Sequence, residues 1–183
     1  ASGVTVDIGT STWGFNTTLL QHIATLGTST ISMAGGAITA GFGVNGQTLQ
    51  IDAGVTGQGF GSINQSSTTP IVNNGSIIGN TVGQTFTINP NTFTNNGTLS
   101  VTAGTMNLSS SSSVTNSVDA SITAGAGTTL NITPSTSFTN DGTLTLGGTT
   151  HTIGTTNSNW TNAGSLALNS GTLNLDGPYT ATG

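Results

Sequence analysis

The chain has 183 residues and contains no lysine, arginine or cysteine, against five acidic residues and two histidines. Without basic side chains it cannot neutralise phosphates, so nucleic acids and anionic membrane surfaces are excluded as partners. The missing cysteines exclude disulfides and thiolate metal sites, and no run approaches the roughly 18 apolar residues of a membrane-spanning helix, so membrane insertion is not expected.

Residues 1–70 are expected to form less regular coils than the rest of one continuous domain. A short helix is predicted over 17–26, because four apolar residues follow helical spacing between a capping asparagine and a terminal glycine. These residues are Leu19, Leu20, Ile23 and Leu26, flanked by Asn16 and Gly27. Residues 30–33, 37–39 and 46–51 alternate as strands do. Residues 54–70 read as a long Gly/Ser/Thr-rich connection that fits no single coil.

From Ile71 to the end of the chain, residues 71–183, a short frame recurs in which an apolar residue is followed by a polar stretch containing asparagine. The frame begins at Ile71, Phe93, Val114, Phe138 and Trp160, at intervals of 22, 21, 24 and 22 residues. A fixed period of this length is typical of a solenoid, whose repeats bury their apolar faces only by stacking on one another.

Two alternating runs follow the frame in most coils. The first is exemplified by 98–101, and the second recurs at 85–88, 105–108, 129–132, 150–153 and 172–175. Three short strands and three turns per coil predict an all-β fold, a parallel β-helix with about 22 residues per coil. General topology preference favours a right-handed coil.

Strand parity assigns the first and third residues of each frame to the interior. Stacking then forms a column of apolar side chains and a column of asparagines. A buried amide must be hydrogen-bonded, and bonds from coil to coil would satisfy it, so the asparagines are interpreted as structural. The predicted structural ladder comprises Asn73, Asn95, Asn116, Asn140 and Asn162, with the aromatic residues Phe93, Phe138 and Trp160.

The coil that begins at Val114 is irregular, because residues 117–119 break the glycine position kept elsewhere, and a local bulge is expected there. Outward parity places Asp119 and Asp141 on the same strand of adjacent coils, offset by two positions and about 8 Å apart, which is in the range used by inverting glycosidases. Nothing nearby would raise a carboxyl pKa, so both are interpreted as solvated turn residues. No catalytic residue is predicted.

His22 and His151 are single residues without acidic companions at metal-ligand spacing. No metal site and no cofactor are therefore predicted. His151 shares the parity of Ile153, so it is expected at the boundary of the core with a backbone group as its partner.

Outward positions of the second run form two files of hydroxyl and amide groups. They resemble the Thr-x-Thr arrays of β-solenoid ice-binding proteins, although threonine is also favoured on any exposed strand. This predicted surface-binding ladder comprises Thr85, Thr87, Thr105, Asn107, Thr129, Asn131, Thr150, Thr152, Thr172 and Asn174.

The stretches 93–101, 138–146 and 163–177 resemble the strand repeats of bacterial autotransporter passengers and filamentous-haemagglutinin-like surface proteins. The likeness covers about residues 71–180 and lies in composition and period, and no translocator is recognised. The resemblance implies a secreted protein at the bacterial cell surface, acting as an adhesin, stalk or extracellular filament.

The expected function is therefore a non-catalytic structural module of such an adhesin or filament. An ice-binding protein and a carbohydrate-binding or polysaccharide-degrading β-helix are the alternatives. Tyr179 falls where the next frame is due and no polar or charged cap follows it, so end-to-end self-association or continuation in a longer chain is expected. Glycan or protein surfaces of a host or matrix are the other expected partners.

Overall fold

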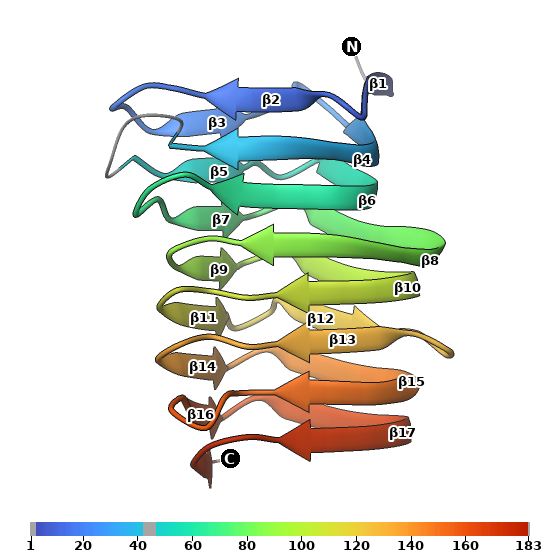
Figure 1. Cartoon of the computed structure of the whole chain (residues 1–183), viewed down its shortest axis with the longest axis vertical. Coiled ribbons are helices and arrows are strands. Elements are labelled where there is room, and N and C mark those ends of the chain that lie inside the picture. Colours follow the sequence, from blue (N-terminus) through green and yellow to red (C-terminus); the bar gives the residue numbers. More distant parts are fainter. Residues whose placement is uncertain (1–2, 42–46, 183) are drawn as a thin grey trace.

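A computed structural model describes residues 3–41 and 47–182 of the chain. It is an all-β solenoid of about eight turns, with parallel strands that recur at a spacing of about 22 residues. The coils stack along one axis, and the two ends of the chain lie at opposite ends of the column (Figure 1). The described strands are β1 (Val4–Gly9), β2 (Thr12–Phe15), β3 (Gln21–Ile23), β4 (Ser29–Ala40), β5 (Leu49–Ile51), β6 (Val55–Gln65), β7 (Ile71–Asn73), β8 (Ser76–Asn89), β9 (Phe93–Asn95), β10 (Thr98–Leu108), β11 (Ser113–Asn116), β12 (Ser121–Ala124), β13 (Thr129–Ile132), β14 (Ser137–Asn140), β15 (Thr143–Ile153), β16 (Asn159–Asn162), β17 (Ser165–Leu175) and β18 (Tyr179–Ala181).

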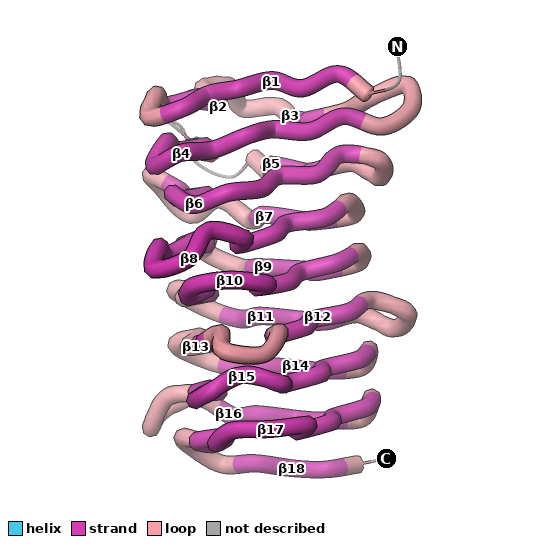
Figure 2. Tube along the Cα trace, turned by 90° about the vertical axis from the view of Figure 1, so that its right-hand side faces the viewer, coloured by secondary structure: helices cyan, strands magenta, loops and turns pink. Residues whose placement is uncertain are grey.

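Each coil presents three walls. Long strands such as β10 bend around a corner, so that residues 98–101 pair on wall A and residues 105–108 pair on wall B. Walls A and B together make the ten-stranded sheet, and the short strands from β3 to β18 make wall C, the eight-stranded sheet. The bend of the long strands is visible from the side in Figure 2.

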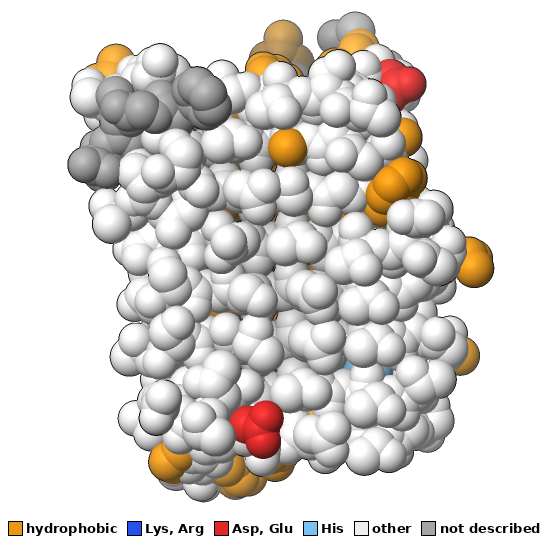
Figure 3. Space-filling model, in the orientation of Figure 1, with side chains coloured by type: hydrophobic (Ala, Val, Ile, Leu, Met, Phe, Trp, Pro, Cys, Tyr) orange, Lys and Arg blue, Asp and Glu red, His pale blue; other side chains and the backbone are white. Residues whose placement is uncertain are grey.

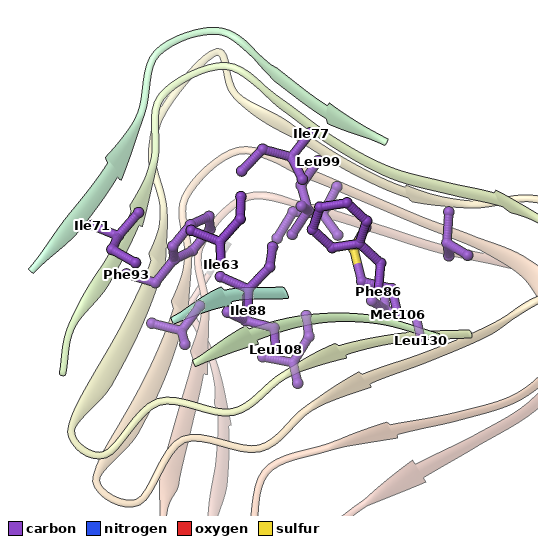
Figure 4. Close-up of a cluster of buried hydrophobic side chains, with 14 of the residues drawn as sticks. Ile63, Ile71, Ile77, Phe86, Ile88, Phe93, Leu99, Met106, Leu108 and Leu130 are labelled. Atoms are coloured by element: carbon purple, nitrogen blue, oxygen red, sulfur yellow. The ribbon is translucent and has the colours of Figure 1, made fainter. Parts of the chain in front are cut away.

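The interior is a narrow apolar column enclosed by the three walls. Burial alternates along each regular strand, as in β14, where Phe138 and Asn140 are buried and their neighbours are partly exposed. Figure 4 shows Ile71 and Phe93 of wall C, Ile77 and Leu99 of wall A, and Ile88 and Leu108 of wall B arranged around the same interior. Narrow coils need few apolar residues, which explains how a chain with 32% hydrophobic content forms a continuous core.

The helix predicted over 17–26 is wrong. Residues 21–23 form β3, which pairs in register with β5, and Leu19, Leu20 and Leu26 are 71%, 52% and 100% exposed. Pairing with the next coil buries Ile23 and satisfies the backbone of this segment. That gain overrides a weak helical pattern in a threonine-rich stretch.

The long connection predicted over 54–70 is also wrong for most of its length. Residues 55–65 form β6, which pairs with β4 on one side and β8 on the other. Gly57 and Gly59 occupy inward positions opposite Ile77 and Gly79, so the alternation carries no apolar side chain there. At Gly59, with φ of 115°, an added Cβ would lie 1.9 Å from the Met33 carbonyl oxygen, so this close approach requires glycine.

The other predicted irregularities are located as follows. Residues 30–33 and 37–39 lie within β4. Of the strand predicted over 46–51, only Leu49–Ile51 is observed, as β5, and Gly46 lies outside the described residues. The assignment of this segment to the second alternating run is wrong, because β5 pairs with β7 on wall C. Residues 117–119 form a longer corner turn between β11 and β12, and they do not bulge a strand. Asp119 adopts a φ of 66° in this turn.

Candidate functional surfaces

The asparagine column is a directional chain of amide hydrogen bonds inside the wall C corner. Each side-chain Nδ2 donates to the Oδ1 of the asparagine in the next coil. The distances are 2.8 Å from Asn73 to Asn95, 2.9 Å from Asn95 to Asn116, 2.7 Å from Asn116 to Asn140 and 2.6 Å from Asn140 to Asn162. The first four residues are fully buried, so the ladder faces the interior and offers no surface to a ligand.

The second amide hydrogen of these side chains is used as well. Nδ2 of Asn116 also donates to the Thr143 carbonyl at 3.1 Å, and Nδ2 of Asn140 donates to the Ser165 carbonyl at 3.1 Å. Each accepting carbonyl belongs to the first residue of the wall A strand in the following coil. The ladder therefore ties wall C of one coil to wall A of the next, which is a structural role.

The aromatic members of the ladder stack in the neighbouring column. Phe93, Val114, Phe138 and Trp160 are aligned in register. The rings of Phe138 and Trp160 are stacked with centroids 5.8 Å apart, and Tyr179 lies 4.6 Å beyond Trp160. These side chains hold adjacent coils together, since aromatic pairs add to the free energy gained by burial.

Wall B carries the predicted surface-binding ladder. Its first file consists of threonine in five consecutive coils: Thr85, Thr105, Thr129, Thr150 and Thr172 are paired in register. Its second file mixes the two residue types and contains Thr87, Asn107, Asn131, Thr152 and Asn174. Nδ2 of Asn131 donates to Oδ1 of Asn107 at 2.8 Å, so part of this file is bonded to itself.

Wall C carries a further threonine file that the sequence analysis did not single out as a surface. It runs through Thr94, Thr115, Thr139, Thr161 and Thr180 in paired register. The second residue of each frame was the available signal. This residue directly precedes the buried asparagine in its strand. It therefore points outward on wall C and stacks in the same register as the asparagine ladder.

A histidine–carboxylate pair lies at the N-terminal end of wall C. Nδ1 of His22 lies 3.0 Å from each carboxylate oxygen of Asp52, and Nε2 of Gln50 donates to Oδ1 of Asp52 at 2.6 Å. The hydrogen bond from His22 lowers the pKa of Asp52, although partial burial opposes the shift. Asp52 lies 30 residues from His22 in the sequence, outside metal-ligand spacing, and the stacking of adjacent coils brings the two residues together.

His151 lies fully inside the core, deeper than the boundary expected from its parity. The backbone N–H of Leu130 points at Nδ1 at 3.2 Å, and that of Gly148 points at Nε2 at 3.1 Å. A neutral imidazole accepts a hydrogen bond at only one nitrogen. Protonation would put N–H groups against both donors, and burial itself lowers the His151 pKa.

We expect this residue to make the fold sensitive to mild acid. The unfolded histidine titrates near about pH 6.5, whereas burial lowers the folded pKa. Below about pH 6.5 the unfolded state therefore binds more protons than the folded state. The contribution of neutral His151 to the free energy of unfolding is complete above that pH and is lost as pH falls toward the folded pKa. Urea unfolding between pH 7.5 and 5 should show this loss, and His151→Leu should remove it. An equal loss in His151→Leu and in the control His22→Asn would contradict the assignment.

Asp119 and Asp141 lie at the corner between walls C and A in neighbouring coils, and not on one strand as predicted. Asp119 is exposed in the longer turn, and Asp141 follows β14 with its backbone N–H donating to the Asn116 carbonyl at 2.8 Å. The remaining acids, Asp7 and Asp176, lie on the first and last described coils. Asp119 and Asp141 thus share one corner of the column, whereas the other carboxylates lie in other coils.

Within residues 3–41 and 47–182 no pocket and no cluster of three or more histidine and acidic side chains is found. The same residues contain no helix long and apolar enough to cross a membrane. No family model, curated protein or solved structure matches the chain. The candidate binding surfaces of the described residues are therefore the polar walls and the two ends of the column.

Proposed function

We propose that the chain is a non-catalytic structural module of an extracellular adhesin or filament, in which the solenoid acts as a rigid spacer. The observation that carries this proposal is the unbroken register of wall A. One outward file bears a hydroxyl in every coil, and the inward column beside it carries an apolar side chain in every coil except at Gly57. The file consists of Thr5, Thr30, Thr56, Ser76, Thr98, Ser121, Thr143 and Ser165.

Such a column lengthens by a fixed increment with every coil, because each coil contacts only its neighbours. The face of the column drawn in Figure 3 is mostly white, with few hydrophobic and acidic side chains between its two ends. Ionic groups on the walls are few, so the stability of the column should depend little on salt concentration. These features suit a stalk that works outside the cell, and the resemblance of residues 93–101 to autotransporter and haemagglutinin repeats supports the same role.

The spacer role can be tested by lengthening the rod. A second copy of residues 93–113, inserted between Ser113 and Val114, preserves the frame and adds one coil. Five inserted copies should extend the particle by about 24 Å at the usual strand spacing, measured by small-angle X-ray scattering. Displayed on a bacterial surface, the longer chain should hold a terminal tag further from the cell.

Failure of the tag to move outward in a folded, lengthened variant would contradict the spacer role. Release of reducing sugars from a polysaccharide panel would instead favour the polysaccharide-degrading alternative. A shuffled insert of the same composition is the control, because it adds the same mass without the repeat.

The all-threonine file of wall B favours a second candidate function, binding to an ordered surface such as ice. Its hydroxyl and methyl groups repeat at the coil spacing over five coils. Freezing-point hysteresis with shaping of ice crystals would support this candidate. Thr129→Tyr, in the middle of the file, should then abolish the effect, whereas Val118→Tyr at an exposed corner should not.

A further inference from the structure

The two ends of the column expose the same side-chain columns that are buried between them. Leu168 and Leu175 at the C-terminal end are 46% and 41% exposed, whereas Leu146 and Ile153, one coil earlier in the same columns, are fully buried. At the N-terminal end Val6 is 40% exposed, and its neighbour Ile31 is 3% exposed. Figure 3 shows hydrophobic atoms at both ends.

The backbone at these ends is also unpaired on one side. β17 and β18 are the last strands of their walls, and β1, β2 and β3 are the first. In the register of the columns, residues 165–167, 174–175 and 179–181 would face residues 5–7, 12–13 and 21–23. Open edges of this kind invite pairing with another strand.

The column register predicts which side chains would meet if one copy were placed on another. Paired residues can be followed from coil to coil along each column to the first coil of the chain. The column that contains Leu166 ends at Val6, and the column that contains Leu175 ends at Trp13. On wall C the column of Ala181 leads to Ile23. One apolar pair would therefore meet on each wall, and Tyr179, whose column leads to Gln21, would face an amide side chain.

The acidic residues do not oppose this arrangement. Asp7 belongs to the column that ends at Ala167, so it would face a methyl group. Asp176 follows Leu175 at the corner, and the corresponding position of the first coil is Gly14. No two carboxylates would face each other across the joint, and the chain has no basic residue that could favour a wrong register.

We propose that copies of this chain stack head to tail, with β17 and β18 of one copy pairing with β1, β2 and β3 of the next. A contact of this type does not close on itself, so repetition yields an open filament along the coil axis. This inference rests on the proposed structural role. The lengthening experiment concerns one copy and the assembly experiment concerns the joint, so either can fail alone.

Engineered cysteines test the joint, because the natural chain contains none. Thr5 and Ser165 occupy opposite ends of one outward file. They lie about 34 Å apart within a copy, seven strand spacings, and directly opposite each other across the proposed joint. The variant carrying Thr5→Cys and Ser165→Cys should form a ladder of disulfide-linked oligomers on oxidation, since paired strands bring the Cα atoms within disulfide range.

The matched control carries Thr5→Cys with Thr180→Cys. Thr180 lies at the same end of the column but on wall C, where its column leads to His22. Equal ladders in the two variants, or no ladder in either, would overturn the proposed register.

Sedimentation velocity provides a second measurement that does not depend on cysteine chemistry. The unmodified chain should form larger species as its concentration rises. Leu175→Lys places a charge in the joint and should shift association to at least tenfold higher concentration. Val82→Lys adds the same charge at a position that is 84% exposed in a corner of β8, and it should leave association unchanged. A monomer at every concentration, or equal effects of the two variants, would refute stacking.

Discussion

Replacing Phe138 by alanine should lower the free energy of unfolding by about 3–5 kcal/mol. The ring is fully buried, aligned with Val114 of the preceding coil and stacked on Trp160 of the following coil. Backbone hydrogen bonds on both sides hold the coil spacing of β14, so the cavity left by the ring cannot collapse easily. Urea denaturation followed by circular dichroism measures the change.

Thr139→Ser is the matched control for this substitution. Thr139 is the next residue of the same strand and points outward, partly exposed. Its replacement should alter stability by no more than about 0.5 kcal/mol, as is usual for surface positions. A loss similar to that of Phe138→Ala would show that the inward and outward faces of wall C had been assigned the wrong way round.

Replacing Asn116 by alanine should destabilise the fold by at least about 2 kcal/mol, because it leaves buried acceptors without donors. Nδ2 of Asn116 donates to Oδ1 of Asn140 and to the Thr143 carbonyl, and both bonds lie inside the structure. Asn95 would lose one acceptor and keep its bonds to the Gly97 and Ser121 carbonyls. The larger part of the effect should therefore fall on the following coil, where hydrogen exchange of β14 and β15 amides should increase.

Asn96→Ala is the control, because Asn96 is also bonded to an asparagine of the adjacent coil but lies outside. Its Nδ2 donates to Oδ1 of Asn74 at 2.9 Å in an exposed position. Water can replace this partner, so the loss should be a small fraction of that at Asn116. Equal losses at the two positions would mean that burial does not determine the contribution of the ladder.

The sequence by itself determined the fold class and most of the regular coils. From Ile71 onward the period, the alternation of apolar residues and the recurring asparagine each constrain the same register, so the inward columns could be predicted. Local side-chain parity is sufficient for this, because a strand directs successive residues to opposite faces whatever its neighbours are.

Only the tertiary structure decided the first three coils. The segment around Gly57 and Gly59 lacks the side chains that reveal alternation, and Leu20 and Ile23 fit a helix as well as a strand. Pairing with β5 and β8 resolves both cases, because a strand in a solenoid is stabilised by its neighbours and not by its own pattern.

The structure also decided the environments of the two histidines. His22 meets Asp52 across 30 residues, and His151 is enclosed where the amides of Leu130 and Gly148 converge on its ring. Such contacts depend on the length of each corner turn, which sets the stacking register. Corner lengths vary from coil to coil, so the sequence period predicts the columns within the strands but not the contacts made by residues at the corners, such as Asp52 and Gly148.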